Sequence, residues 1–348
     1  MKESLTKKML PAPIGGGFRM EGYWVWCGSV IRAEDGRYHM FASRWPKCYP
    51  MHPGWLIASE IVRAVSDTPE GPYRFAEVVL PARGAEYWDG RATHNPHIFR
   101  WNGRYYLYYV GTTHPFRELR EGEQLTLEDC RTVVARSNKR IGVAAADQIT
   151  GPWKRMDEPV LKTRPGFFDS FLVSNPAPCI NQDGGVTLVY KARAYCKPPY
   201  PEFLHGKMEF GVASAPCPEG PYRYESDVPL FRDPAVQFED PFIWRDGDGY
   251  NMIAKDMNGN VCGEKYGGLF ASSPDGIHWE FQKDFLMYSR RVLWDDGAVR
   301  EMGNLERPFL LFEDGKPAYA FFATSDGKDG QGFANCTETW NMVIPLKK

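Results

Sequence analysis

Short runs of large apolar and aromatic residues recur along the chain, and in five places two such runs flank a turn that contains glycine. Apolar residues alternate with other residues on both sides of the turn, a pattern that predicts a β-hairpin. The five copies begin at Gly28, Asn95, Asn175, Asp240 and Arg307. Successive starts are 67, 80, 65 and 67 residues apart, so the hairpins form an internal repeat.

A third apolar strand follows each of the first four hairpins. In three copies it ends in a Gly-Pro-aromatic turn, at Gly71, Gly151 and Gly220, whereas the fourth copy has the turn 273–279. The fifth copy ends in the apolar segment 340–346. Repeating units of three or four strands predict an all-β protein, a five-bladed β-propeller. A two-domain β-sandwich is the alternative, but it would not repeat its turn chemistry five times.

The predicted propeller is a single domain that spans residues 1–348. Its blades would start near residues 28, 95, 175, 240 and 307.

Composition agrees with this fold and excludes several classes of protein. Of 348 residues, 43% are hydrophobic and 25% are charged, which is typical of a globular chain and excludes disorder and coiled coil. Aromatic residues at 14%, with 34 Gly and 28 Pro, favour short strands joined by tight turns. The net charge of −2 and the absence of a basic stripe predict no nucleic-acid partner. No apolar run reaches the roughly 20 residues of a membrane-spanning helix, so no membrane partner is predicted.

The beginning of the chain and its cysteines bear on location. Residues 1–13 are charged and lack an apolar stretch, which predicts no signal peptide and a cytoplasmic protein. If a leader had been removed, the protein would instead be periplasmic or secreted. The eight Cys have no paired spacing and indicate buried thiols in a reducing compartment. Because Cys and His also lack metal-ligand spacing, we expect no cofactor and no metal, with a single cation in the channel as an open alternative.

Propeller geometry concentrates polar residues at one end of the channel. The innermost strand of a blade starts on the face where its second strand ends, so these positions from several blades converge on one mouth. The strand starts carry Asn95, Asn175, Asp240 and Arg307, with Glu239 and Glu306 just before the last two. The strand ends carry Arg44, His114, Lys191, Arg193, Lys255 and Asp256.

The acidic opening 239–242 (Glu-Asp-Pro-Phe), the turn 273–279 and the Gly-Pro-aromatic turns resemble the five-bladed glycoside hydrolases of families 43, 32 and 117. The resemblance extends from about Gly22 to the end of the chain. It implies that carboxylates from different blades cleave a glycosidic bond, usually with inversion. Family 117 is the closer comparison, because its catalytic acids also lie late in the chain, and it acts on anhydro-galactose sugars. One departure is clear: these families place a general base as Asp-Pro on the first inner strand, where this chain has Trp-Cys-Gly-Ser at 26–29.

Four carboxylates are candidates for catalysis, which needs one group to protonate the leaving oxygen and another to activate water or attack the sugar. Asp240 and Glu306 open adjacent inner strands and are predicted to be the central pair. Asp89 and Asp169 each follow two aromatic residues, six positions before an inner strand. We expect them in loops over the mouth, tuning a pKa or serving as the base. Which group is acid and which is base stays open.

Other mouth residues are predicted to bind substrate. The set is His94, Asn95, Asn175, Glu239, Arg307, Arg44, Lys191, Arg193, Lys255 and Trp26. Glu239 is also an alternative second carboxylate, and Trp26 would stack on a sugar ring. The cations of the set would suit a carboxylated or sulfated sugar.

The predicted function is that of an exo-acting, inverting glycoside hydrolase that cleaves an oligosaccharide, with an acidic or anhydro sugar as its substrate. A phosphorylase that holds phosphate on the cationic rim is one alternative. A carbohydrate-binding propeller without catalysis is another, favoured by the missing first-blade Asp. The sequence predicts neither the sugar and linkage nor the oligomeric state.

Overall fold

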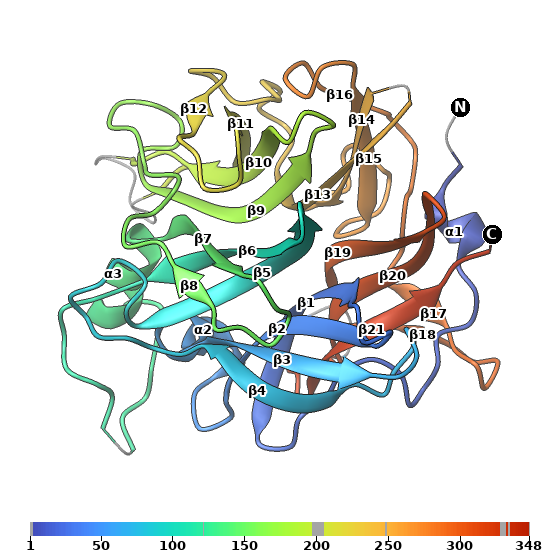
Figure 1. Cartoon of the computed structure of the whole chain (residues 1–348), viewed down its shortest axis with the longest axis horizontal. Helices are drawn as coiled ribbons and strands as arrows, with labels where there is room; N and C mark the ends of the chain where they lie inside the picture. Colours follow the sequence, from blue (N-terminus) through green and yellow to red (C-terminus); the bar gives the residue numbers. More distant parts are fainter. Residues whose placement is uncertain are drawn as a thin grey trace.

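A computed structural model of the protein describes residues 3–347, apart from residues 121, 197–204, 248, 328–331 and 333–334. Five antiparallel sheets surround a central axis (Figure 1). In each sheet the strands follow one another in chain order from the axis outward. This arrangement confirms the all-β, five-bladed prediction.

The blades share one plan. Blade 1 consists of β1 (Tyr23–Arg32), β2 (Tyr38–Pro46), β3 (Glu60–Ser66) and β4 (Arg74–Leu80). Blade 2 consists of β5 (Ala92–Trp101), β6 (Arg104–Thr112), β7 (Arg140–Ala146) and β8 (Lys154–Arg155). Blade 3 consists of β9 (Leu172–Ile180), β10 (Val186–Arg193), β11 (Glu209–Ala215) and β12 (Arg223–Tyr224). Blade 4 consists of β13 (Phe238–Asp246), β14 (Gly249–Asp256), β15 (Gly268–Ser273) and β16 (Glu280–Phe281). Blade 5 consists of β19 (Asn304–Glu313), β20 (Lys316–Ser325) and β21 (Thr339–Pro345).

The second strand of a blade is buried on both faces, because a neighbouring blade covers each face. In β6 every residue after the first is buried, which explains its nearly continuous apolar and aromatic sequence. Tyr105 packs in one cluster with Phe41 of blade 1, and Tyr108 packs in another with Tyr190 of blade 3. Burying each large side chain contributes about 1.5–3 kcal/mol, so the seams between blades form the core.

Each inner strand bulges at one residue in the left-handed region. The five residues, with φ from 52° to 59°, are Cys27, Asn95, Asn175, Asp240 and Arg307. The pairing between the inner and second strands shifts at each of them. In four blades the residue after the bulge residue is proline. Proline has no N–H to donate, and none is needed there because the bulge interrupts the hydrogen bonds between the two strands. Gly28 follows in the first blade, so Cys27 is the counterpart of the other four and the predicted first blade start is one residue late.

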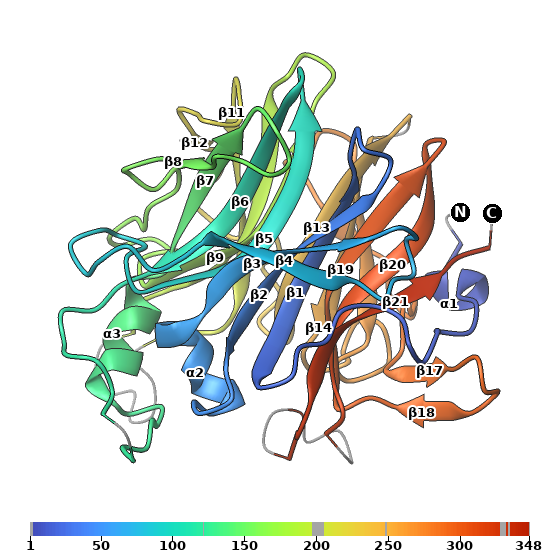
Figure 2. The same ribbon diagram turned by 60° about the horizontal axis from the view of Figure 1, so that its bottom comes forward.

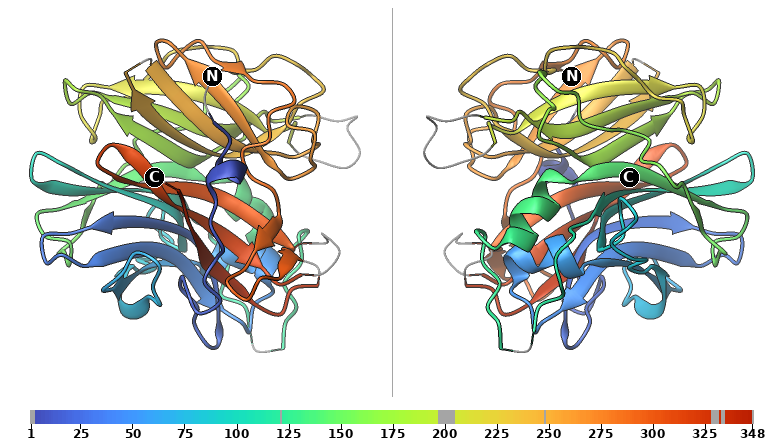
Figure 3. Two further views of the ribbon diagram at one scale, coloured as in Figure 1. Left: turned by 90° about the vertical axis from the view of Figure 1, so that its right-hand side faces the viewer. Right: turned by 90° about the vertical axis from the view of Figure 1, so that its left-hand side faces the viewer.

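The propeller closes through both ends of the chain. Met9 forms a bridge with Leu346, and Phe18 forms another with Asn341 at the outer edge of β21. Two backbone bonds of 2.9 and 3.0 Å join Phe18 and Asn341. The N-terminal segment therefore takes the place of a fourth strand in blade 5, and the two ends of the chain lie on the same side of the molecule (Figure 3).

Helices occur only as short insertions in the part of the chain that the structure describes. α1 (Leu5–Lys8) lies in the N-terminal segment, α2 (Met51–Ala58) joins β2 to β3, and α3 (Cys130–Ser137) joins β6 to β7. α2 and α3 contact each other beside blades 1 and 2 (Figure 2). A small hairpin, β17 (Arg291–Leu293) and β18 (Val299–Glu301), precedes blade 5. None of the described helices has the length and apolarity needed to span a membrane.

Candidate active site

The five bulge residues lie in a ring around the channel. The amide of Asn95 lies 2.8 Å from Cys27 Sγ, 2.9 Å from Asn175 Oδ1 and 3.0 Å from Arg307 Nη1. Asn175 Nδ2 donates to Asp240 Oδ1 at 3.0 Å, and Arg307 Nη1 contacts the same oxygen at 2.9 Å. The predicted Asn95, Asn175, Asp240 and Arg307 are thus brought together, and their side chains bind one another across the channel.

The residues just before the bulges form a second layer, which faces a pocket of about 90 Å³. Its lining comprises Trp26, Trp45, Met51, His52, Trp55, His94, Glu239, Glu306 and Arg307. Glu239 of β13 and Glu306 of β19 occupy equivalent positions on adjacent blades, because each stands two residues before the proline.

This geometry corrects the predicted carboxylate pair. Asp240 is the counterpart of Arg307, not of Glu306, and its fully buried side chain belongs to the ring at the channel. Glu239, predicted to bind substrate, lines the pocket together with Glu306.

Lysine side chains hold the two glutamates. Lys255 Nζ lies 2.8 Å from Glu239 Oε2, 2.7 Å from Glu306 Oε1 and 3.9 Å from Asp240 Oδ2. Lys191 Nζ lies 2.5 Å from the other oxygen of Glu239. The carboxylates of Glu239, Glu306 and Asp240 thus surround Lys255 in a buried network, and Lys191 of blade 3 extends this network.

The network sets opposite pKa shifts in neighbouring carboxyl groups. Burial favours the neutral form of Glu239, but Lys191, Lys255 and Arg307 together outweigh it and hold the pKa of Glu239 well below its usual range. Burial raises the pKa of Asp240 to about 6; Arg307 opposes this rise, and the negative charge of Glu239 adds to it. Glu239 is therefore ionised over the whole neutral range, and Asp240 is the group that titrates near neutrality.

Aromatic residues form the wall of the pocket. The ring of Trp55, on α2, stacks on His94 with centroids 4.5 Å apart, and Trp45 meets His94 edge-on at 5.7 Å. Ser59 Oγ lies 2.8 Å from His94 Nδ1 and orients the imidazole. Burial, with the nearby charges of Arg307 and the lysines, lowers the pKa of His94 well below its usual value. His94 is therefore neutral and serves as a hydrogen-bonding partner instead of a charged acid.

The predicted cations separate into different environments. Arg44 lies outside the pocket lining, 2.8 Å from Glu60 and against the rings of Tyr23 and Phe75, so its predicted place at the mouth is wrong. The side chain of Arg44 points to the outer part of blade 1, so its guanidinium binds Glu60 on β3. Lys191, Lys255 and Arg307 are bound to the carboxylates described above, whereas Arg193 binds His205 and the carbonyl of Gly206.

Asp89 and Asp169 do not lie over the mouth. Asp89 is fully buried, where it contacts Arg83 at 2.6 Å and Arg155 at 3.3 Å and accepts a hydrogen bond from Tyr109. Asp169 repeats the arrangement in blade 3 with an arginine and a tyrosine. The sequence repeat is real, but the carboxylate after two aromatic residues anchors the inter-blade loop to the second strand of the next blade.

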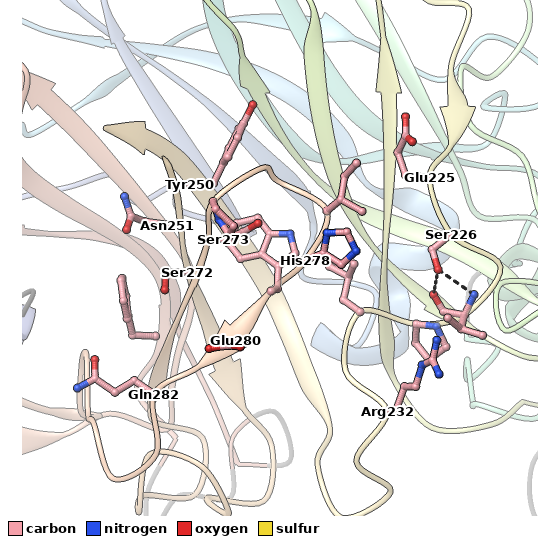
Figure 4. Close-up of a pocket in the computed structure, with 17 residues that line it drawn as sticks. Glu225, Ser226, Arg232, Tyr250, Asn251, Ser272, Ser273, His278, Glu280 and Gln282 are labelled. Atoms are coloured by element: carbon pink, nitrogen blue, oxygen red, sulfur yellow. Dashed lines mark hydrogen bonds between the residues drawn. The ribbon is translucent and has the colours of Figure 1, made fainter. Parts of the chain in front are cut away.

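A larger groove of about 850 Å³ lies on the outer strands of blades 3 and 4 (Figure 4). Tyr250, Ser273, His278 and Glu280 line it, and no ring residue does. The turn 273–279 is part of this groove, where Ser273 and Asp275 accept bonds from the turn backbone. That sequence motif therefore shapes a turn and lies apart from the glutamate pair.

Within the described ranges, no group of three or more His, Cys, Asp or Glu side chains is placed to hold a metal ion. The expectation of no cofactor stays a prediction.

Four residues of the pocket lining are missed by sequence reasoning, one of them Met51 at the start of α2. The other three, Trp45, His52 and Trp55, likewise lie at the end of β2 or in the insertion that follows it. The signal that could have indicated them is a tryptophan in an insertion that follows a strand end. Because the other blades do not repeat it, the comparison of repeats does not detect it.

These features define a five-bladed β-propeller whose mouth holds a carboxylate pair inside an aromatic pocket. No protein-family model and no curated protein matches the chain. Solved structures do match it. A structure described as a complex of BT0996 and RGII has a TM-score of 0.67 at 16% identity, covering 98% of this protein and 93% of the other.

Two further similar structures are glycoside hydrolases by name. Zg3597, a family 117 glycoside hydrolase from the marine bacterium Zobellia galactanivorans, has a TM-score of 0.66 at 15% identity, with 98% of this protein and 90% of the other covered. A thermostable family-43 glycoside hydrolase has a TM-score of 0.61 at 14% identity, covering 97% and 92%. The predicted resemblance to families 117 and 43 is thus confirmed for the fold.

Proposed function

We propose that the protein is a glycoside hydrolase whose reactive carboxylates are Glu239 and Glu306. One observation carries the proposal: two glutamates at equivalent positions of adjacent blades face one pocket, and a single lysine fixes both. Trp26, Trp45 and Trp55 line the same pocket and make the wall beside the glutamates aromatic. The similar structures named as glycoside hydrolases support the same activity.

The distance between the carboxylates favours retention of configuration over the inversion expected from the sequence. One Glu239 oxygen and one Glu306 oxygen contact the same Lys255 nitrogen, so these oxygens lie at most about 5.5 Å apart. This upper limit is compatible with the 5–5.5 Å of retaining enzymes. Inverting enzymes need roughly 6.5–9.5 Å to admit a water molecule.

In this mechanism Glu239, kept ionised by its lysines, attacks the anomeric carbon while the glycosidic bond breaks. Glu306 gives a proton to the leaving oxygen. A water oxygen then bonds to the anomeric carbon, the bond from Glu239 to that carbon breaks and frees the carboxylate, and Glu306 takes up the proton of the water. The ring of bulge residues narrows the channel beneath the pocket, which supports attack at the end of an oligosaccharide and hence exo action.

The test is turnover of a panel of plant and algal oligosaccharides by the E239Q and E306Q variants, with E158Q on an exposed loop as the matched control. We expect each active-site variant to lose about 10²–10⁴-fold in kcat and E158Q to keep wild-type activity. NMR of the first product anomer distinguishes retention from inversion. Near-wild-type turnover by both variants would show that the pair is structural.

A non-catalytic carbohydrate-binding propeller is the second candidate. It is favoured by the first inner strand, which presents Trp26 and Cys27 in place of a carboxylate. If this candidate is correct, the wild-type protein binds sugars from the panel in calorimetry and releases no product from any of them.

A further inference from the structure

Four cationic side chains meet beside the tryptophan wall of the pocket. Arg136 belongs to the last turn of α3, Lys139 follows that helix, and Lys191 and Arg193 end β10. The backbone of Lys139 joins the group to blade 3, because its carbonyl accepts from the N–H of Val173 at 3.5 Å. The neighbours of Val173 in β9 pair with Lys191 and Arg193 across the sheet.

The cluster has far more positive than negative charge. Lys139 is only 4% exposed, and its ammonium lies 4.3 Å from the centre of the Trp55 ring. Among the described residues, no carboxylate lies within ion-pair distance of Lys139, Arg136 or Arg193. Glu239 is the acidic group whose charge acts on each of these three, and its oxygens already contact Lys191 and Lys255.

Such an arrangement is unfavourable for the folded protein by itself. A buried cation without a paired anion loses its hydration, and a contact with an aromatic ring such as Trp55 offsets only part of that loss. Burial, reinforced by Lys191 and Arg136, lowers the pKa of Lys139 well below its usual value. Burial also lowers the pKa of Arg136 and Arg193. An apolar side chain would be more stable at position 139, so the lysine is explained best by a ligand that brings negative charge.

We propose that Arg136, Lys139 and Arg193, together with Lys191, form an oxyanion site next to the glutamate pair. Its ligand is a carboxylate, sulfate or phosphate group. Arg193 is held in place for such a ligand, because its Nη1 is fixed by His205 and the Gly206 carbonyl. The site differs from the cationic rim expected from the sequence, since Arg44, Lys255 and Arg307 are bound to carboxylates elsewhere.

The inference rests on the proposed function in one respect: the anion belongs to a reactant of the same pocket. It is either an acidic group carried by the sugar or free phosphate. In the second case a phosphate oxygen forms the new bond to the anomeric carbon, the glycosidic C–O bond breaks, and Glu306 protonates the leaving oxygen. The products are a sugar phosphate and a shortened oligosaccharide.

Binding is tested without catalysis, by calorimetric titration of the full chain with sulfate, phosphate, galacturonate and neutral galactose in a low-chloride buffer. The variants are K139M, which keeps the length of the side chain, R193M and its conservative partner R193K. K162M, an exposed lysine on another loop, is the control. Thermal unfolding of every variant confirms that it is folded.

We expect wild type and K162M to bind at least one of the oxyanions more tightly than galactose, and K139M and R193M to bind it at least tenfold more weakly. R193K should retain part of the affinity. The E239Q variant, which removes the nearby negative charge, should bind as tightly as wild type or more tightly. The proposal is overturned if no oxyanion binds better than galactose, or if folded K139M and R193M both bind like wild type.

Two activity measurements then identify the source of the anion. Sugar phosphate detected by ³¹P NMR, with turnover that requires phosphate, assigns the site to a free co-substrate. Faster release of a terminal uronate than of its neutral counterpart, with the difference lost in K139M, assigns it to the sugar. If the oxyanion binds but no substrate is cleaved, the site stands and the proposed hydrolase does not.

Discussion

Replacing Lys255 by methionine is the sharpest test of how the site is held together. Methionine matches the length of lysine but removes the charge that lies between three acidic side chains. The contacts of Lys255 Nζ are 2.8 Å to Glu239, 2.7 Å to Glu306 and 3.9 Å to Asp240. The side chain is 3% exposed, so water cannot take the place of the ammonium group.

The size of the effect follows from these distances. With an effective dielectric constant of about 20, the contacts represent gross attractions of about 6, 6 and 4 kcal/mol. The desolvation of the ammonium group offsets much of this sum, and breaking a buried ion pair typically costs about 3–5 kcal/mol. We therefore expect K255M to lower the free energy of unfolding by about 3–5 kcal/mol.

The loss should depend on pH in a defined direction. Without Lys255 the folded-state pKa values of Glu239 and Asp240 rise, so the folded variant binds more protons than the unfolded chain above about pH 4. Stability that comes from a raised carboxyl pKa is present at low pH and is lost as the pH rises through the folded-state value. The deficit of K255M relative to wild type should therefore be smaller at pH 5 than at pH 8.

Urea unfolding at pH 5, 6.5 and 8 measures this deficit, and the K255M/E306Q double variant measures the coupling. Because E306Q removes one of the unpaired charges, the double variant should be less destabilised than the sum of the single variants. A deficit below 1 kcal/mol that does not change with pH would refute the reasoning, since it would mean that the carboxylates do not need this cation.

Further predictions concern residues around the site. Burial raises the pKa of the Cys27 thiol, so iodoacetamide at pH 8 should modify the exposed Cys48 and Cys130 and leave Cys27 unmodified, as read by peptide mass spectrometry. D89N should lower the free energy of unfolding by about 3–5 kcal/mol in urea and leave kcat unchanged, because Asp89 binds two arginines away from the pocket. The free energy of unfolding of D240N, relative to wild type, should rise by about 2.4 kcal/mol between pH 4 and pH 7, because the raised pKa of Asp240 makes its ionisation unfavourable in the folded wild-type protein. Parallel stability curves of the two proteins would contradict this.

The fold could be predicted from the sequence because a propeller repeats its local rules. Alternation of apolar residues, glycine turns and proline after the bulge recur in register, and each repeat supports the same interpretation. The pattern places the first blade one residue late, since Gly28 follows the bulge there in place of proline and the left-handed residue is Cys27.

The site could be predicted only in part, because its geometry depends on which side of a bulge a residue lies. The sequence indicates the acidic opening of two adjacent blades, but a shift of one residue separates Glu239 in the pocket from Asp240 in the ring. Trp55 and Lys139 could not be found in this way. They lie in and beside helical insertions that occur in single blades, and their position depends on contacts between α2 and α3.

The closure of blade 5 has a consequence for synthesis of the chain. Phe18 is synthesised before all five blades, yet its strand partner Asn341 is made more than three hundred residues later. At about 5–20 residues per second, roughly 15–65 s separate the two. Until then Phe18 lacks the edge of β21 with which it pairs. The nascent protein therefore holds the N-terminal segment without its strand partner until blade 5 is made, and the ring can close only after that.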